Sequence, residues 1–108
     1  MLLVVADDWE SSAGRLQRFA RERGAAAWHP AGVPLAVSLG RCGLAWGRGL
    51  HPVPDGGGAR KREGDGRAPA GVFAITALFG VASADSDLAR TAKLPYLGAT
   101  CDLKCIDD

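Results

Sequence analysis

The chain has 108 residues, with 13 Lys and Arg against 12 Asp and Glu, which gives a formal net charge of +1 at pH 7. This length suits one domain over residues 1–108 rather than a two-domain enzyme. The balanced charge argues against a strongly basic nucleic-acid-binding protein, so we expect no nucleic-acid partner. Apolar residues make up 47% of the chain, but 19 of them are Ala, so the sequence predicts a thin core.

The first segment, Met1 to Ala6, is a short apolar run that ends at Asp7 and Asp8, and this pattern predicts a strand. It lacks the basic start and the apolar run of about 7–15 residues that a signal peptide needs. No stretch reaches the roughly 20 apolar residues of a membrane-spanning helix. We therefore expect no membrane span, and the chain as written carries no export signal, which alone would leave it in the cytoplasm.

The next segments predict a turn at Ser11–Gly14 and then either a helix or a short strand over Leu16–Arg23. Val33–Leu39 alternates large apolar side chains with Pro, Ala and Ser, which predicts a half-buried strand ending at Gly40. Ten of the 15 glycines lie between Gly40 and Gly71, so this middle part is expected to form long loops without regular helix.

Three further segments complete the chain. Gly71–Phe79 is β-branched and aromatic on both faces, which predicts a central strand covered on both sides. Ser83–Leu88 is small and polar and predicts a loop, and Leu94–Leu97 predicts a short extended piece. The sequence therefore predicts a mostly β domain with long glycine-rich loops.

The segment from Lys61 to Phe73 reads KREGDGRAPAGVF and combines charged side chains with glycines. One interpretation is an anion site that uses Arg62, Arg67 and backbone N–H groups. The other is a tight structural loop held by its own Arg–carboxylate pairs. We expect at least one of Gly64 and Gly66 to adopt a positive φ. A phosphate-binding P-loop is excluded because no Gly-Lys-Ser/Thr is present.

The segment GRCGLAWGRGLH, residues 40–51, places Trp46, Arg48 and His51 beside flexible backbone. It predicts either one wall of a substrate groove or a loop whose Trp46 covers the thin core. The three cysteines, Cys42, Cys101 and Cys105, form no disulfide framework and no recognised zinc spacing. We therefore expect no metal and no other cofactor.

Taken in order, these segments resemble the YkuD-type L,D-transpeptidase catalytic domain of bacteria. The resemblance rests on Asp8-Trp9, on GRCGLAWGRGLH, on the stretch from Gly64 to Phe73, and on the LPY and C-x-D-D segments near the end. Cys42 departs from the pattern, which has a small or amide side chain there. The resemblance implies a partial β-sandwich or β-barrel domain. The candidate residues for a substrate groove remain those suggested by the residue types, namely Trp46, Arg48, His51, Arg62 and Arg67.

The family's catalytic His and Cys lie downstream of the C-x-D-D segment, where this sequence ends. No residue of the chain matches them, so the resemblance assigns no catalytic residue here. It implies the N-terminal part of a cysteine acyl-transfer enzyme that acts on peptidoglycan stem peptides without a cofactor, in the periplasm or cell envelope. We expect the chain alone to be inactive and prone to self-association.

A second interpretation is a standalone small β module without catalysis. It would bind an anionic or glycan ligand through Arg48, Arg62 and Arg67. The basic, glycine-rich middle of the chain motivates it, together with the lack of a complete catalytic set.

Overall fold

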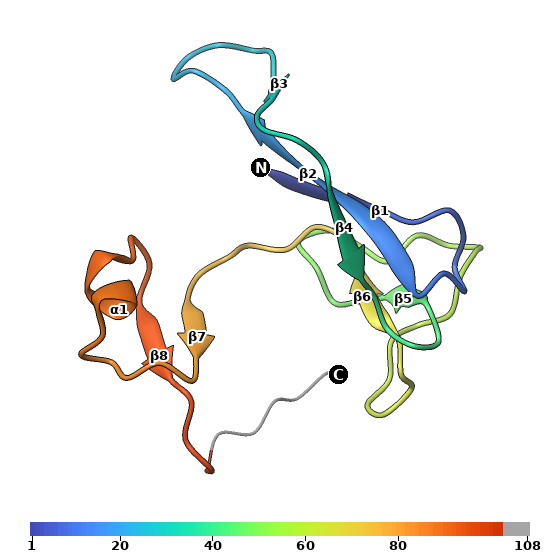
Figure 1. Ribbon diagram of the computed structural model, residues 1–108. Coiled ribbons are helices and arrows are strands. Elements are labelled where there is room, and N and C mark those ends of the chain that lie inside the picture. Colours follow the sequence, from blue (N-terminus) through green and yellow to red (C-terminus); the bar gives the residue numbers. More distant parts are fainter. Residues whose placement is uncertain (103–108) are drawn as a thin grey trace.

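The computed structural model describes residues 1–102. Within them strands dominate and helix is confined to one short segment, which confirms the predicted mostly β class. The strands form one four-stranded sheet and two two-stranded sheets. In Figure 1 the last small sheet and the helix lie to one side, joined to the rest by an extended segment.

The four-stranded sheet is built around strand β2 (Ala13–Ala20). Strand β1 (Leu2–Val5) pairs with it on one side, and β3 (His29–Pro30) and β4 (Leu35–Ser38) pair with it on the other, all antiparallel. The predicted strands over residues 1–6 and 33–39 are thus confirmed as strands. The expected half-burial of the second is wrong, because Val33 and Leu35 are 78% and 56% exposed. For the ambiguous segment 16–23 the strand interpretation is correct, because partners on both sides take up the backbone hydrogen bonds of β2.

The chain reverses between β1 and β2 through a turn that Asp8 organises. Its carboxylate oxygen Oδ1 accepts hydrogen bonds from the Glu10 backbone N–H (2.9 Å) and the Ser11 hydroxyl (3.1 Å). This is the usual way in which an Asp side chain stabilises a tight turn. The turn places Trp9 beside the glycine-rich middle of the chain.

The glycine-rich middle folds around two parallel strands, β5 (Leu44–Trp46) and β6 (Ala68–Ala70). Gly43, Ala45 and Gly47 are the buried residues of the part of the chain that the structure describes. Their small size explains this position: a Cβ on Gly47 would lie 2.8 Å from a side-chain atom of Pro69. As predicted, this part contains no regular helix.

The predicted central strand over Gly71–Phe79 is wrong. Only its end is a strand, as β7 (Leu78–Gly80), which pairs in parallel with β8 (Tyr96–Gly98). Val72 and Ile75 are 60% and 58% exposed, so neither face is covered. The apolar pattern was correct for extended backbone, but a strand also needs a neighbour, and residues 73–77 pair with no strand among residues 1–102.

The predicted loop over Ser83–Leu88 is correct for residues 83–86 and wrong for the last two residues. Helix α1 (Asp87–Thr91) begins after Ser86, whose hydroxyl accepts the Ala89 backbone N–H at 3.2 Å. Asp87 in the first turn and Arg90 in the last turn match the helix dipole. The Ser-Asp pair is a recognisable helix start that the sequence interpretation missed.

The chain is loosely packed. Its radius of gyration is 16.1 Å, whereas a compact domain of this length has about 13 Å. Val81, Val33 and Leu50 are 97%, 78% and 72% exposed. The predicted thin core is therefore confirmed. Among the described residues, no helix has the length and apolar character needed to cross a membrane.

Candidate functional site

Three of the segments that carry the resemblance come together at one point in the structure, although they lie far apart in the sequence: the Asp8-Trp9 turn, residues 40–51 and the stretch that begins at Gly64. The LPY segment leads instead into β8, and the C-x-D-D segment lies outside the described residues. The backbone oxygen of Trp9 accepts the Leu44 N–H (2.7 Å) and one Arg67 guanidinium nitrogen (3.3 Å). The same nitrogen of Arg67 donates to the Leu44 carbonyl at 2.8 Å. Arg67 also approaches the exposed Glu10 carboxylate at 3.7 Å. Arg67 therefore joins the Asp8-Trp9 turn to strand β5, and we call residues 8–10 and 40–72 the glycine-rich unit.

Three rings form an aromatic cluster in this unit: Trp9, Trp46 and His51. Trp46 contacts the other two edge-on, with centroid distances of 5.1 Å to Trp9 and 5.9 Å to His51. The Trp46 indole N–H donates to the Gly57 carbonyl at 2.6 Å, which holds the loop after β5 against the ring. All three residues are half-buried, so the cluster covers the small core and stays partly open to solvent.

The loop between Lys61 and Arg67 is organised by Asp65. Its carboxylate accepts the Lys61 ammonium at 2.7 Å and the backbone N–H groups of Arg62 and Arg67 at 2.8 and 2.9 Å. Asp65 is thus held by a Lys side chain and two backbone donors rather than by an Arg side chain. Gly64 and Gly66 have φ values of 74° and 68°, which confirms the predicted positive φ. The arrangement is that of a structural loop, because the Asp65 carboxylate accepts its hydrogen bonds from residues of the same loop.

The hydrogen bond from Lys61, followed by the backbone hydrogen bond from Arg62, lowers the pKa of Asp65 from 3.8 to about 2. Because the pKa is lowered on folding, the ionised carboxylate stabilises the loop above pH 3.8, and this contribution is lost as the pH falls through about 2. We expect an acid titration followed by tryptophan fluorescence to show this loss. Asp65→Asn should remove it, whereas Asp55→Asn, at an exposed loop position, should not; equal curves for both variants would contradict it.

The five predicted groove residues differ in their contacts and exposure. Trp46 and His51 are in ring contact, and Arg48 lies exposed between them in the sequence. Arg62 is an exposed loop residue. The Arg67 guanidinium is directed at backbone carbonyls inside the unit, so it acts as a structural donor. The sequence interpretation did not single out Asp65 or the Trp9 carbonyl, although both organise this unit.

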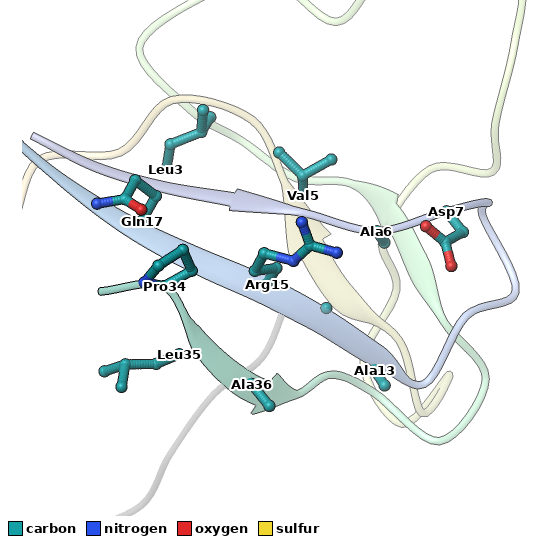
Figure 2. Close-up of a pocket in the computed structure, with 11 residues that line it drawn as sticks. Leu3, Val5, Ala6, Asp7, Ala13, Arg15, Gln17, Pro34, Leu35 and Ala36 are labelled. Atoms are coloured by element: carbon teal, nitrogen blue, oxygen red, sulfur yellow. The ribbon is translucent and has the colours of Figure 1, made fainter. Parts of the chain in front are cut away.

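The structure also contains a shallow open groove of about 700 Å³ on one face of the four-stranded sheet. Figure 2 shows Leu3, Val5, Pro34 and Ala36 around the central Arg15. None of the five predicted residues lines it. The groove and the glycine-rich unit are therefore separate candidate surfaces.

The residue types that carry metal and thiol chemistry are dispersed over the described part of the chain. No group of three or more His, Cys, Asp and Glu side chains there could hold a metal ion. Cys42 and Cys101 are free and exposed, and Cys105 lies outside the described residues. The His51 nitrogen Nδ1 is 2.8 Å from the Pro52 carbonyl; because a carbonyl only accepts, a hydrogen bond there requires the tautomer with Nδ1 protonated.

No family model matches the chain, and searches of curated proteins and of solved structures found no match either. The functional argument therefore rests on the residues themselves and on how the structure assembles them.

Proposed function

We propose that this chain is the N-terminal part of a peptidoglycan L,D-transpeptidase-like domain of sandwich or barrel type, which works in the cell envelope. One observation carries this proposal. The Asp8-Trp9 turn, the GRCGLAWGRG stretch and the Gly-Asp-Gly-Arg stretch are separate in sequence, yet they form one hydrogen-bonded unit through Trp9, Leu44 and Arg67. If the three motifs occurred in one sequence by chance, nothing would require them to contact one another in the structure.

In the proposed reaction a cysteine thiolate attacks a peptide carbonyl of one stem peptide, and the terminal D-amino acid leaves. The amine of a second stem then attacks the acyl-enzyme and releases the thiolate. No residue of this chain matches the family's catalytic His or Cys, so we assign none. The role proposed for this chain is one wall of the groove, where the half-buried rings of Trp46 and His51 and the exposed Arg48 residue face the stem peptide.

Binding can be tested without catalysis. We expect a tetrapeptide stem, added to the isotope-labelled chain, to shift the NMR signals of the Trp46 indole N–H and of the Gly47 and Gly49 amides. Arg48→Gln should weaken this binding several-fold, because it removes a cation that can pair with a peptide carboxylate. Arg23→Gln removes the same charge from an exposed loop and should leave binding unchanged. Shifts confined to the sheet groove around Arg15 would contradict the proposal.

The chain alone is expected to show no turnover of a tetrapeptide donor. A thiol nucleophile needs its base and oxyanion donors in one site, and the described residues do not assemble such a set around a cysteine. Mass spectrometry of the incubated peptide should show no released D-amino acid. Release that disappears in Cys101→Ser or Cys105→Ser would contradict this expectation.

The alternative, a standalone module for an anionic or glycan ligand, requires Arg48 and Arg62, which are both exposed in the glycine-rich unit. Arg67 is engaged with backbone oxygens and is a poor donor for such a ligand. Titration with an anionic saccharide separates the two functions. Shifts at Arg48 and Arg62 with the saccharide, and none with the tetrapeptide, would favour the alternative.

A further inference from the structure

The two outer edges of the four-stranded sheet differ in their protection. On the β4 side, the Leu39 N–H donates to the Ser12 carbonyl. Because alternate residues of an antiparallel strand bond to the neighbouring strand, the backbone groups of Val37 and Leu35 face β2 and those of Pro34 and Ala36 point outward. Pro34 has no N–H, and a proline at an edge position discourages strand addition. On the β1 side, Leu2–Val5 contains neither a proline nor a charge and, unlike β4, has no proline directly before it. Strand β1 is therefore the unprotected edge.

The hydrogen-bond pattern identifies which backbone groups this edge offers. Met1 and Phe19 exchange two backbone hydrogen bonds, of 2.8 and 3.0 Å. In an antiparallel pair every second residue does this, so Leu3 and Val5 also bond to β2. The N–H and C=O groups of Leu2 and Val4 then point away from the sheet, and neither has a hydrogen bond to another described residue. All four β1 side chains are also exposed, between 44% and 56%.

We propose that β1 pairs antiparallel with β1 of a second copy of this chain, about a two-fold axis at Val4. This register places Val4 opposite Val4 and Leu2 opposite Ala6, so that all the outward-facing groups at positions 2, 4 and 6 are used. It is self-complementary, as a two-fold interface requires. Strand addition at an open edge is a common recognition mode.

Side chains on one face of the sheet support this register. Val4, Leu16 and Leu35 lie opposite one another across β1, β2 and β4. Pairing at Val4 places Val4 against Val4 of the second copy on this face, whereas Leu35 lies at the far edge and pairs only within its own copy. Apolar cross-strand neighbours of this kind stabilise a sheet.

Charge favours the antiparallel direction. Strand β1 is followed by Asp7 and Asp8, and a parallel pair would place these carboxylates side by side. The antiparallel pair instead puts them at the end of the sheet where β2 of the other copy carries Arg18 and is followed by Arg21. Because these charges are exposed, their contribution should weaken with added salt.

The test is sedimentation of the 108-residue chain over a concentration series, with far-UV circular dichroism to verify the fold of each variant. We expect a monomer–dimer equilibrium that Val4→Lys shifts at least ten-fold toward monomer, because it places two like charges opposite each other. Leu2→Pro removes an outward N–H without touching the internal ladder and should have the same effect. The matched control Leu35→Lys, on the same face but at the other edge, should leave the equilibrium unchanged.

Hydrogen exchange provides a second readout that does not depend on any variant. The amides of Leu2 and Val4 should become protected as the concentration rises, whereas the Ala36 and Ser38 amides should not. A chain that stays monomeric throughout the series would overturn the proposal. It would also be overturned if Leu35→Lys dissociated the dimer as well as Val4→Lys does, because the copies would then be stacked by their faces.

Discussion

Gly43→Ala is expected to unfold the glycine-rich unit. Gly43 has a φ of 85°, and a Cβ added there would lie 2.0 Å from the Trp9 carbonyl oxygen and 2.6 Å from the Glu10 Cα. Both are backbone atoms in a turn that Asp8 holds in place, so neither can move without disrupting the hydrogen bonds of that turn. We expect a loss of at least about 4 kcal/mol, which exceeds the usual effect of a point mutation. Urea unfolding followed by tryptophan fluorescence measures it.

Gly64→Ala is the matched control for this prediction. Gly64 also has a positive φ, 74°, but a Cβ there would meet no atom within 4 Å. Only the cost of the left-handed conformation remains, which is about 1–2 kcal/mol. Similar losses for the two variants would show that the close approach of Gly43 to the Trp9 turn does not exist in solution.

Replacing Arg67 by methionine is expected to separate the Asp8-Trp9 turn from strand β5. The Arg67 side chain is only 24% exposed, and its guanidinium donates to the Leu44 and Trp9 carbonyls. Hydrogen bonds that involve a charged group contribute about 1.5–3 kcal/mol each, and methionine keeps much of the apolar stem while removing the donors. We expect a loss of about 2–3 kcal/mol in the free energy of unfolding. The NMR signals of Trp9 should shift as well.

Arg62→Met tests whether this effect belongs to Arg67 alone. Arg62 is exposed in the same loop, and the hydrogen bond that it makes to Asp65 uses its backbone N–H, which methionine retains. Its replacement should change stability by no more than about 0.5 kcal/mol. If Arg62→Met were as destabilising as Arg67→Met, the loss would reflect the net charge of the loop rather than the bonds to Trp9 and Leu44.

Sequence alone determined the features that depend on local chemistry. The alternation in residues 33–39 was sufficient to predict β4, and the apolar run at residues 1–6 was sufficient to predict β1. Both patterns are typical of short strands and fit few other conformations. The positive φ of Gly64 and Gly66 followed from glycines beside charged residues in a short loop. The small number of large apolar side chains correctly predicted a thin core. Ser86 and Asp87 carried a local signal for helix α1 that could have been recognised.

Tertiary structure decided everything that required a partner. Segment 71–79 has the composition of a buried strand, yet pairing begins only at Leu78, because periodicity describes the backbone of a strand and not the presence of a neighbour. Arg67 has the residue type of a ligand-binding cation, but the nearby Trp9 and Leu44 carbonyls make it a structural donor. The ambiguous segment 16–23 became a strand because β1 and β4 satisfy its hydrogen bonds from both sides. Contacts between residues distant in the chain are set by packing, and no local pattern encodes them.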